Sequence, residues 1–67
     1  MVSQENSELL KKIMYEARQG YLSRSGKDRE NHFVNNKYDF ATVAEADGRD
    51  VGIYQRLFDA YVIGGVK

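Results

Sequence analysis

The chain contains no cysteine, and this absence removes two common ways of stabilising a short protein. Without thiols there is no disulfide framework and no cysteine-based zinc site. At 67 residues, the chain is also small. A domain of this size buries only about 60% of the surface that its unfolded form exposes, and one core then rarely contributes more than about 3 to 5 kcal/mol. We therefore expect stability to come from packing, from a partner chain, or from both.

A long hydrophobic run is missing as well. The longest uncharged, apolar-rich stretch, from Ala60 to Val66, is far too short to cross a bilayer. The first eight residues are polar and include two acids, unlike the basic and apolar regions of a secretory signal. Apolar residues make up 42% of the chain and charged residues 30%, as in soluble globular proteins. We expect one small cytoplasmic domain over residues 1–67, with residues 1–6 as a disordered tail.

The net charge is zero, but the charges are unevenly distributed. Residues 11–37 carry seven basic and three acidic side chains, a net charge of +4. Residues 38–67 carry three basic and five acidic side chains, a net charge of −2. The first of these segments is suited to an acidic partner, whereas the second would repel nucleic acid.

Two segments have the apolar spacing of amphipathic helices. In the first, Ser7 stands in front of the apolar stripe, where its hydroxyl can cap the helix. In the second, Asp47 or Asp50 can cap the start, and Gly64 and Gly65 can end the helix. The stripes recur at intervals of three and four residues and consist of Leu9, Leu10, Ile13, Met14, Ala17 and Tyr21, then Val51, Tyr54, Leu57, Phe58, Tyr61 and Val62.

The middle of the chain is harder to interpret. Residues 23–36 are polar and show no period, which indicates a loop or a single helical turn. Residues 39–54 fit a short helix that Asp39 would cap and that would end near Asp47 and Gly48. They also fit a hairpin, because Asp47 and Gly48 suit a type I′ turn. Three alanines and a glutamate within residues 41–46 favour the helix.

The predicted fold is therefore all-α, a compact bundle of three to four short helices. The alternative is an α+β fold with the N-terminal helix and a small antiparallel hairpin around Asp47-Gly48. The predicted core consists of Leu9, Leu10, Ile13, Met14, Ala17, Phe40, Val43, Val51, Tyr54, Leu57, Phe58, Tyr61 and Val62.

The sequence offers little material for catalysis. His32 is the one histidine, it has no cysteine to activate, and the serines form no recognisable triad pattern. Asp47 and Asp50 lack the further oxygen ligands of a calcium loop. We expect no enzyme, no metal, no cofactor and no small-molecule substrate.

Binding is the better-supported class of function. Arg24, Lys27 and Arg29 lie in a basic segment that can dock on an acidic protein surface. Tyr15 and Tyr38 are the tyrosines expected to lie outside the core, and tyrosine is well suited to interfaces. The leading hypothesis is a non-enzymatic protein-binding module, acting as a regulator, inhibitor or adaptor, or as a self-associating subunit of a homodimer.

A resemblance supplies the competing hypothesis. The string Val43-Ala44-Glu45-Ala46-Asp47-Gly48, with Gly52 and Phe58 after it, resembles the helix-turn-helix of TetR-type repressors. The resemblance implies a DNA-binding regulator that uses residues 43–61, with Arg49 and Arg56 on the DNA. The sequence departs from the pattern at Arg49, where the family has an apolar residue that packs the two helices together.

Overall fold

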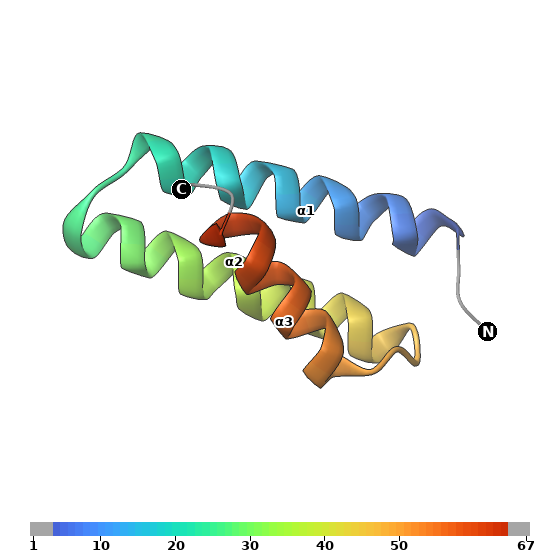
Figure 1. Ribbon diagram of the computed structural model, residues 1–67. Coiled ribbons are helices and arrows are strands. Elements are labelled where there is room, and N and C mark those ends of the chain that lie inside the picture. The colour runs from blue at the N-terminus through green and yellow to red at the C-terminus, as the bar shows by residue number, and fades with distance from the viewer. Residues whose placement is uncertain (1–3, 65–67) are drawn as a thin grey trace.

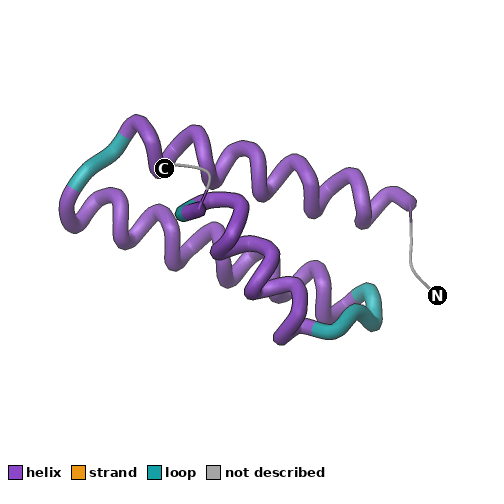
Figure 2. Tube along the Cα trace, in the orientation of Figure 1, coloured by secondary structure: helices purple, strands orange, loops and turns teal. Residues whose placement is uncertain are grey.

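The chain folds into three helices that share one core. A computed structural model describes residues 4–64, in which α1 spans Gln4–Ser23, α2 spans Gly26–Ala46 and α3 spans Val51–Val62 (Figure 1). These residues contain no strand (Figure 2). The all-α prediction is confirmed, with three helices, and the hairpin alternative is wrong. Asp47 and Gly48 instead form the turn that separates α2 from α3.

The helices are arranged as an antiparallel pair crossed by a third. The short connection between Ser23 and Gly26 returns the chain, so that α2 runs back beside α1. The third helix begins over the end of α2 and approaches the C-terminal half of α1 near its own end (Figure 1). Gly26, the first residue of α2, and Gly48, in the connection between α2 and α3, have φ angles of 59° and 75°. Glycine adopts this left-handed region without steric cost.

The first helix begins earlier than the sequence predicts. Gln4, Glu5 and Asn6 form its first turn, although they belong to the segment predicted as a tail; residues 1–3 lie outside the described residues. Ser7 therefore lies within the helix and does not cap it. The Asn6 amide donates to an Asp47 carboxylate oxygen at 2.8 Å, a contact across 41 positions of sequence. Such distant contacts hold the extra turn in place, and local sequence carries no trace of them.

The largest difference lies between residues 26 and 36, predicted as a loop or single turn but folded as the first half of α2. Asp39, predicted as a cap, lies in the middle of this helix. The reason is tertiary packing, because the Phe33 ring lies 6.0 Å from Tyr21 and 5.4 Å from Phe58. One aromatic residue anchors this otherwise polar half, which explains why no apolar period is visible there.

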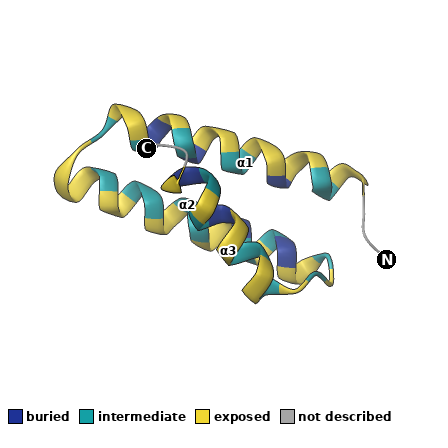
Figure 3. Cartoon of the chain, viewed as in Figure 1, coloured by how far each residue is buried: buried dark blue, intermediate teal, exposed yellow. Residues whose placement is uncertain are grey.

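The core is small and centres on Phe58. Its ring lies 5.4 Å from Phe33 and 5.2 Å from Phe40, so α3 is attached to both halves of α2. Figure 3 shows the buried residues on the inward faces of the helices. Leu9 and Leu57, predicted in the core, are exposed, Leu57 by 49%. The buried hydrophobic side chains are Leu10, Ala17, Phe40, Ala44, Phe58 and Val62; Ile13, Met14, Val43, Tyr54 and Tyr61 pack against them while partly exposed.

Gly20 lets α1 and α2 approach closely. It is buried, and the His32 imidazole lies directly against it. A Cβ atom at position 20 would lie 2.0 Å from His32 Nε2, closer than any van der Waals contact permits. The helical glycine is therefore used to make room for the imidazole.

Phe58→Ala is expected to cost about 3 to 5 kcal/mol, as is typical of buried phenylalanines, and this equals the whole stability of many domains of this size. Denaturant unfolding followed by circular dichroism should show a chain that is largely unfolded without denaturant. The adjacent Leu57→Ala is the control and should cost about 1 kcal/mol or less because that side chain is half exposed. Equal losses for the two variants would contradict the described core.

Gly20→Ala should destabilise the protein by about 1 kcal/mol, since overpacking of about 1 to 3 kcal/mol outweighs a helix-propensity gain of about 1 kcal/mol. In a His32→Ala background the clash is removed, and the same change should become stabilising. The measurement is the free energy of unfolding of all four proteins. A stabilising effect in both backgrounds would show that the imidazole does not constrain position 20.

Candidate functional site

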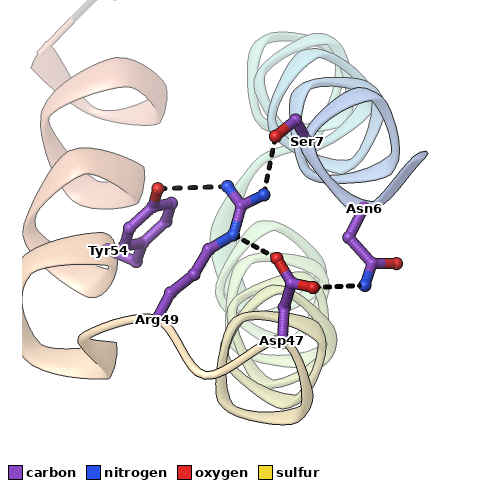
Figure 4. Close-up of polar contacts among 5 residues, drawn as sticks. All are labelled: Asn6, Ser7, Asp47, Arg49 and Tyr54. Atoms are coloured by element: carbon purple, nitrogen blue, oxygen red, sulfur yellow. Dashed lines mark hydrogen bonds and ion pairs between the residues drawn. The ribbon is translucent and has the colours of Figure 1, made fainter. Parts of the chain in front are cut away.

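A buried polar cluster joins all three helices around Arg49 (Figure 4). Arg49 Nε donates to Asp47 Oδ2 at 2.6 Å, and the two terminal nitrogens of the guanidinium donate to Ser7 Oγ at 2.6 Å and to the Tyr54 hydroxyl at 3.1 Å. Asn6 donates to the other oxygen of Asp47. The cluster ties the first turns of α1 to the connection after α2 and to the first turns of α3.

The charges in this cluster are withdrawn from solvent. The side chains of Arg49 and Asp47 are 6% and 5% exposed. The hydrogen bond to Asp47 raises the pKa of Arg49 above its ordinary value, and burial opposes the increase. The guanidinium therefore stays charged, and its stabilising contribution is lost only when the pH rises through that raised pKa. Such a paired, hydrogen-bonded charge is suited to holding helices together.

The two arginines of the helix-turn-helix hypothesis lie in different environments. Arg49 packs the α2–α3 connection against α1 and α3, the role that the repressor pattern gives to an apolar residue. Arg56 is exposed on α3. Within residues 4–64 it has no ion-pair partner. Of the two predicted DNA contacts, Arg56 alone presents its charge to solvent.

The predicted basic segment lies at the turn between α1 and α2. Arg24 forms an ion pair with Asp28 at 3.4 Å. The Arg29 guanidinium stacks over the Tyr21 ring at 4.5 Å from its centre, while Lys27 is exposed. Two of the three predicted basic contacts are thus already engaged within the chain.

The two predicted interface tyrosines are exposed but do not share one surface. Tyr38, 70% exposed, borders a shallow hollow between α2 and α3 that Val51 and Gln55 also line. Tyr15 is exposed on α1. The structure brings neither of them together with the three basic residues of the α1–α2 turn.

A groove lies between the N-terminal half of α1 and the side of α3. It has a volume of about 370 Å³, and the almost fully buried side chains of Leu10 and Phe40 are among those that line it. It opens because α3 leans away from the start of α1 (Figure 1). Its lining, here called the α1–α3 groove, consists of Gln4, Ser7, Leu10, Lys11, Met14, Phe40, Arg49, Tyr54 and Leu57.

Exposed apolar side chains continue the groove along both of its rims. On α1, Tyr15 follows Lys11 by one turn, and both side chains are exposed. On α3, Ile53 precedes Leu57 by one turn, and both are about half exposed. Helical side chains four residues apart are neighbours, so Ile53 and Leu57 form an apolar ridge on α3, whereas on α1 Tyr15 lies next to the cationic Lys11. A surface of this kind is typical of an interaction site.

Sequence reasoning missed this groove. Leu57 fits the apolar spacing of its helix, which predicts a core position, whereas the structure leaves it half exposed. A usable signal was present: α3 carries more apolar positions than one buried face can hold, since Ile53 lies beyond the predicted stripe.

The described residues offer little support for a catalytic or metal-binding site. His32 Nε2 is buried without a hydrogen-bond partner in the described part of the chain. No group of three or more His, Asp or Glu side chains within residues 4–64 is arranged to hold a metal ion. None of the described helices is long and apolar enough to traverse a lipid bilayer.

Comparison with known proteins gives no relative. No protein-family model matches the chain, and neither a curated protein nor a solved structure is significantly similar to it.

Arg49→Met should lower the melting temperature clearly more than Arg56→Met, because it leaves the Asp47 carboxylate buried without its cation. Adding Asp47→Asn to Arg49→Met should restore part of the loss. Thermal unfolding by circular dichroism measures all three proteins. Equal melting temperatures for the two single variants would show that the buried cluster contributes nothing to the fold.

Proposed function

We propose that this protein is a non-enzymatic protein-binding module that takes up a helix of another protein in the α1–α3 groove. It would act there as a regulator, inhibitor or adaptor. The observation that carries the proposal is a groove lined by the partly exposed Met14 and the half-exposed Leu57, with the exposed side chains of Ile53 and Tyr15 next to it. Helix-in-groove binding uses this combination of features.

The dimensions of the groove favour a helical occupant. Its α1 wall runs from Gln4 to Met14, which corresponds to about 15 Å along a helix axis. A partner segment of about ten helical residues has that length and presents an apolar stripe of three or four side chains. Met14 and Leu57 supply the exposed apolar surface against which such a stripe would pack. Docking would give the three-helix core a fourth helix and bury the rims.

Charge argues for a foreign partner over a second copy. Lys11 lines the groove, and Arg56 stands one turn after Ile53 on the α3 rim. A two-fold dimer through this surface would place the same patch of each copy face to face. The four unpaired basic side chains would then approach one another, and juxtaposed like charges cost free energy.

DNA binding has weaker support. DNA affinity depends chiefly on basic side chains that neutralise phosphates. Arg49 is buried and paired with Asp47. Lys37 of α2 is also engaged, because it forms an ion pair with Asp59 of α3 at 3.0 Å. This leaves Arg56 as the one exposed cation of α3. One positive charge is too little for α3 to bind in a groove of DNA.

The test replaces one exposed side chain at a time with a photo-crosslinking amino acid in the cells that make the protein. From positions 57 and 15 we expect adducts with the same foreign protein, and from position 38, on the far side of α3, none. That partner is then purified, and its Kd is measured by titration calorimetry. Leu57→Ser should weaken binding by about tenfold or more, as expected for a residue at the centre of an interface, whereas Tyr38→Ser should not.

Three results would overturn the proposal. They are adducts from position 38 but not from position 57, adducts from position 57 with a second copy alone, and a Kd that Leu57→Ser leaves unchanged. Circular dichroism of each variant ensures that the helices are intact.

A further inference from the structure

We infer that the outer face of α2 is a second interaction surface, and that its partner is a second copy of this chain whose own α2 packs against it in the antiparallel direction. This surface lies between α2 and α3, away from the α1–α3 groove. The inference therefore goes beyond the proposed function and does not depend on it. It is drawn from the spacing of exposed side chains along α2 and from the charges at the two ends of that row.

The first observation is a stripe of side chains on α2 that the core does not use. Its members recur at alternating intervals of four and three residues, the spacing of helices that pack as coiled coils. The buried residues of α2, Phe40 and Ala44, are not among them. All members are exposed except Ala41, which is partly buried. The stripe, here called the α2 outer stripe, consists of Lys27, Asn31, Val34, Tyr38, Ala41 and Glu45.

The middle of the α2 outer stripe is apolar and adjoins a hollow. Val34 and Tyr38 are neighbours one turn apart, and their side chains are 55% and 70% exposed. Tyr38 and Ala41 border the hollow between α2 and α3, which has a volume of about 310 Å³. A side chain of a facing helix would enter this hollow in the way that knobs enter holes between packed helices.

The charges select the direction of the facing helix. Lys27 and Glu45 stand at opposite ends of the stripe, about 27 Å apart along the helix axis. Within residues 4–64, neither forms an ion pair, and both are exposed. In a parallel pair of copies, each would face its own counterpart, and like charges would meet. In an antiparallel pair centred at the level of residue 36, Lys27 of each copy faces Glu45 of the other.

The same antiparallel register suits the middle of the stripe. Val34 of each copy faces Tyr38 of the other, and Asn31 faces Ala41. The apolar side chains therefore meet at the centre, and Val34 lies at the mouth of the other copy's hollow. The stripe is thus complementary to itself, as a two-fold interface requires.

The neighbouring charges of α2 do not oppose this register. Asp28 and Lys37 are already paired within the chain. Glu30, one turn after Lys27, is exposed and has no ion-pair partner in the described part of the chain. In the antiparallel register Glu30 faces the uncharged Thr42 of the other copy, so no acid faces another acid across the interface.

Engineered cysteines test the register. The chain has no cysteine of its own, so added thiols report contacts without a native background. In an air-oxidised mixture of Lys27→Cys and Glu45→Cys chains, we expect the main disulfide to join position 27 of one copy to position 45 of the other. Two copies of position 27 should link far less, because they lie about 27 Å apart in the antiparallel pair. Mass spectrometry of the digested products identifies the linked positions.

Charge reversal tests the ion pairs. Sedimentation equilibrium over a concentration series at low salt gives the Kd of the dimer. Lys27→Glu should weaken the dimer by about tenfold, because two attractive contacts become repulsive. Lys27→Glu/Glu45→Lys exchanges the signs of both pairs and should return the Kd close to that of the original chain. The control Lys12→Glu changes an exposed lysine on α1 and should leave the Kd unaltered.

Three results would overturn the inference while circular dichroism shows intact helices. They are a chain that stays monomeric up to about 1 mM, a main disulfide between two copies of position 27, and a Kd that Lys27→Glu leaves unchanged. All three are measured on the isolated protein, so they are independent of any partner of the α1–α3 groove. In the cellular crosslinking experiment, position 38 should give adducts with a second copy alone, which leaves the result from position 57 unaffected.

Discussion

The structure depends on the attachment of α3 to the antiparallel pair formed by α1 and α2. Two sets of contacts are central to that attachment. The Phe58 ring packs between Phe33 and Phe40, and the Arg49 cluster fixes the start of α3 against the start of α1. One contact is apolar and non-directional, while the other is polar and sets position through hydrogen-bond geometry. Together they give a chain without disulfides a defined arrangement of three helices.

The groove follows from this geometry. Because α3 leaves the α2 end and slants toward the C-terminal half of α1, its first turns cannot cover the first turns of α1. Tyr54 helps to bury Phe40, at 6.1 Å between ring centres, while the groove beside Met14 and Leu57 stays open. In so small a protein, an uncovered apolar surface is a cost to stability, which is why we assign it a binding role.

How far the sequence predicts this structure differs between the helices. The helices α1 and α3 were predictable because each carries its own apolar stripe. The first half of α2 was not, since Phe33 is its main apolar anchor and its ring contacts lie on other helices. The groove was unpredictable for a related reason. Whether Leu57 is buried or exposed depends on the slant of α3, which the Arg49 cluster fixes through residues 42 positions apart.

The central claim is that a partner helix covers the α1–α3 groove, and hydroxyl-radical footprinting of the protein with and without the captured partner tests it most directly. Side-chain oxidation reports solvent access residue by residue. The account predicts that the partner lowers oxidation of Met14, Tyr15 and Leu57 and leaves Tyr38 unchanged. Protection of Tyr38, with Met14 and Leu57 as reactive as in the isolated protein, would contradict it.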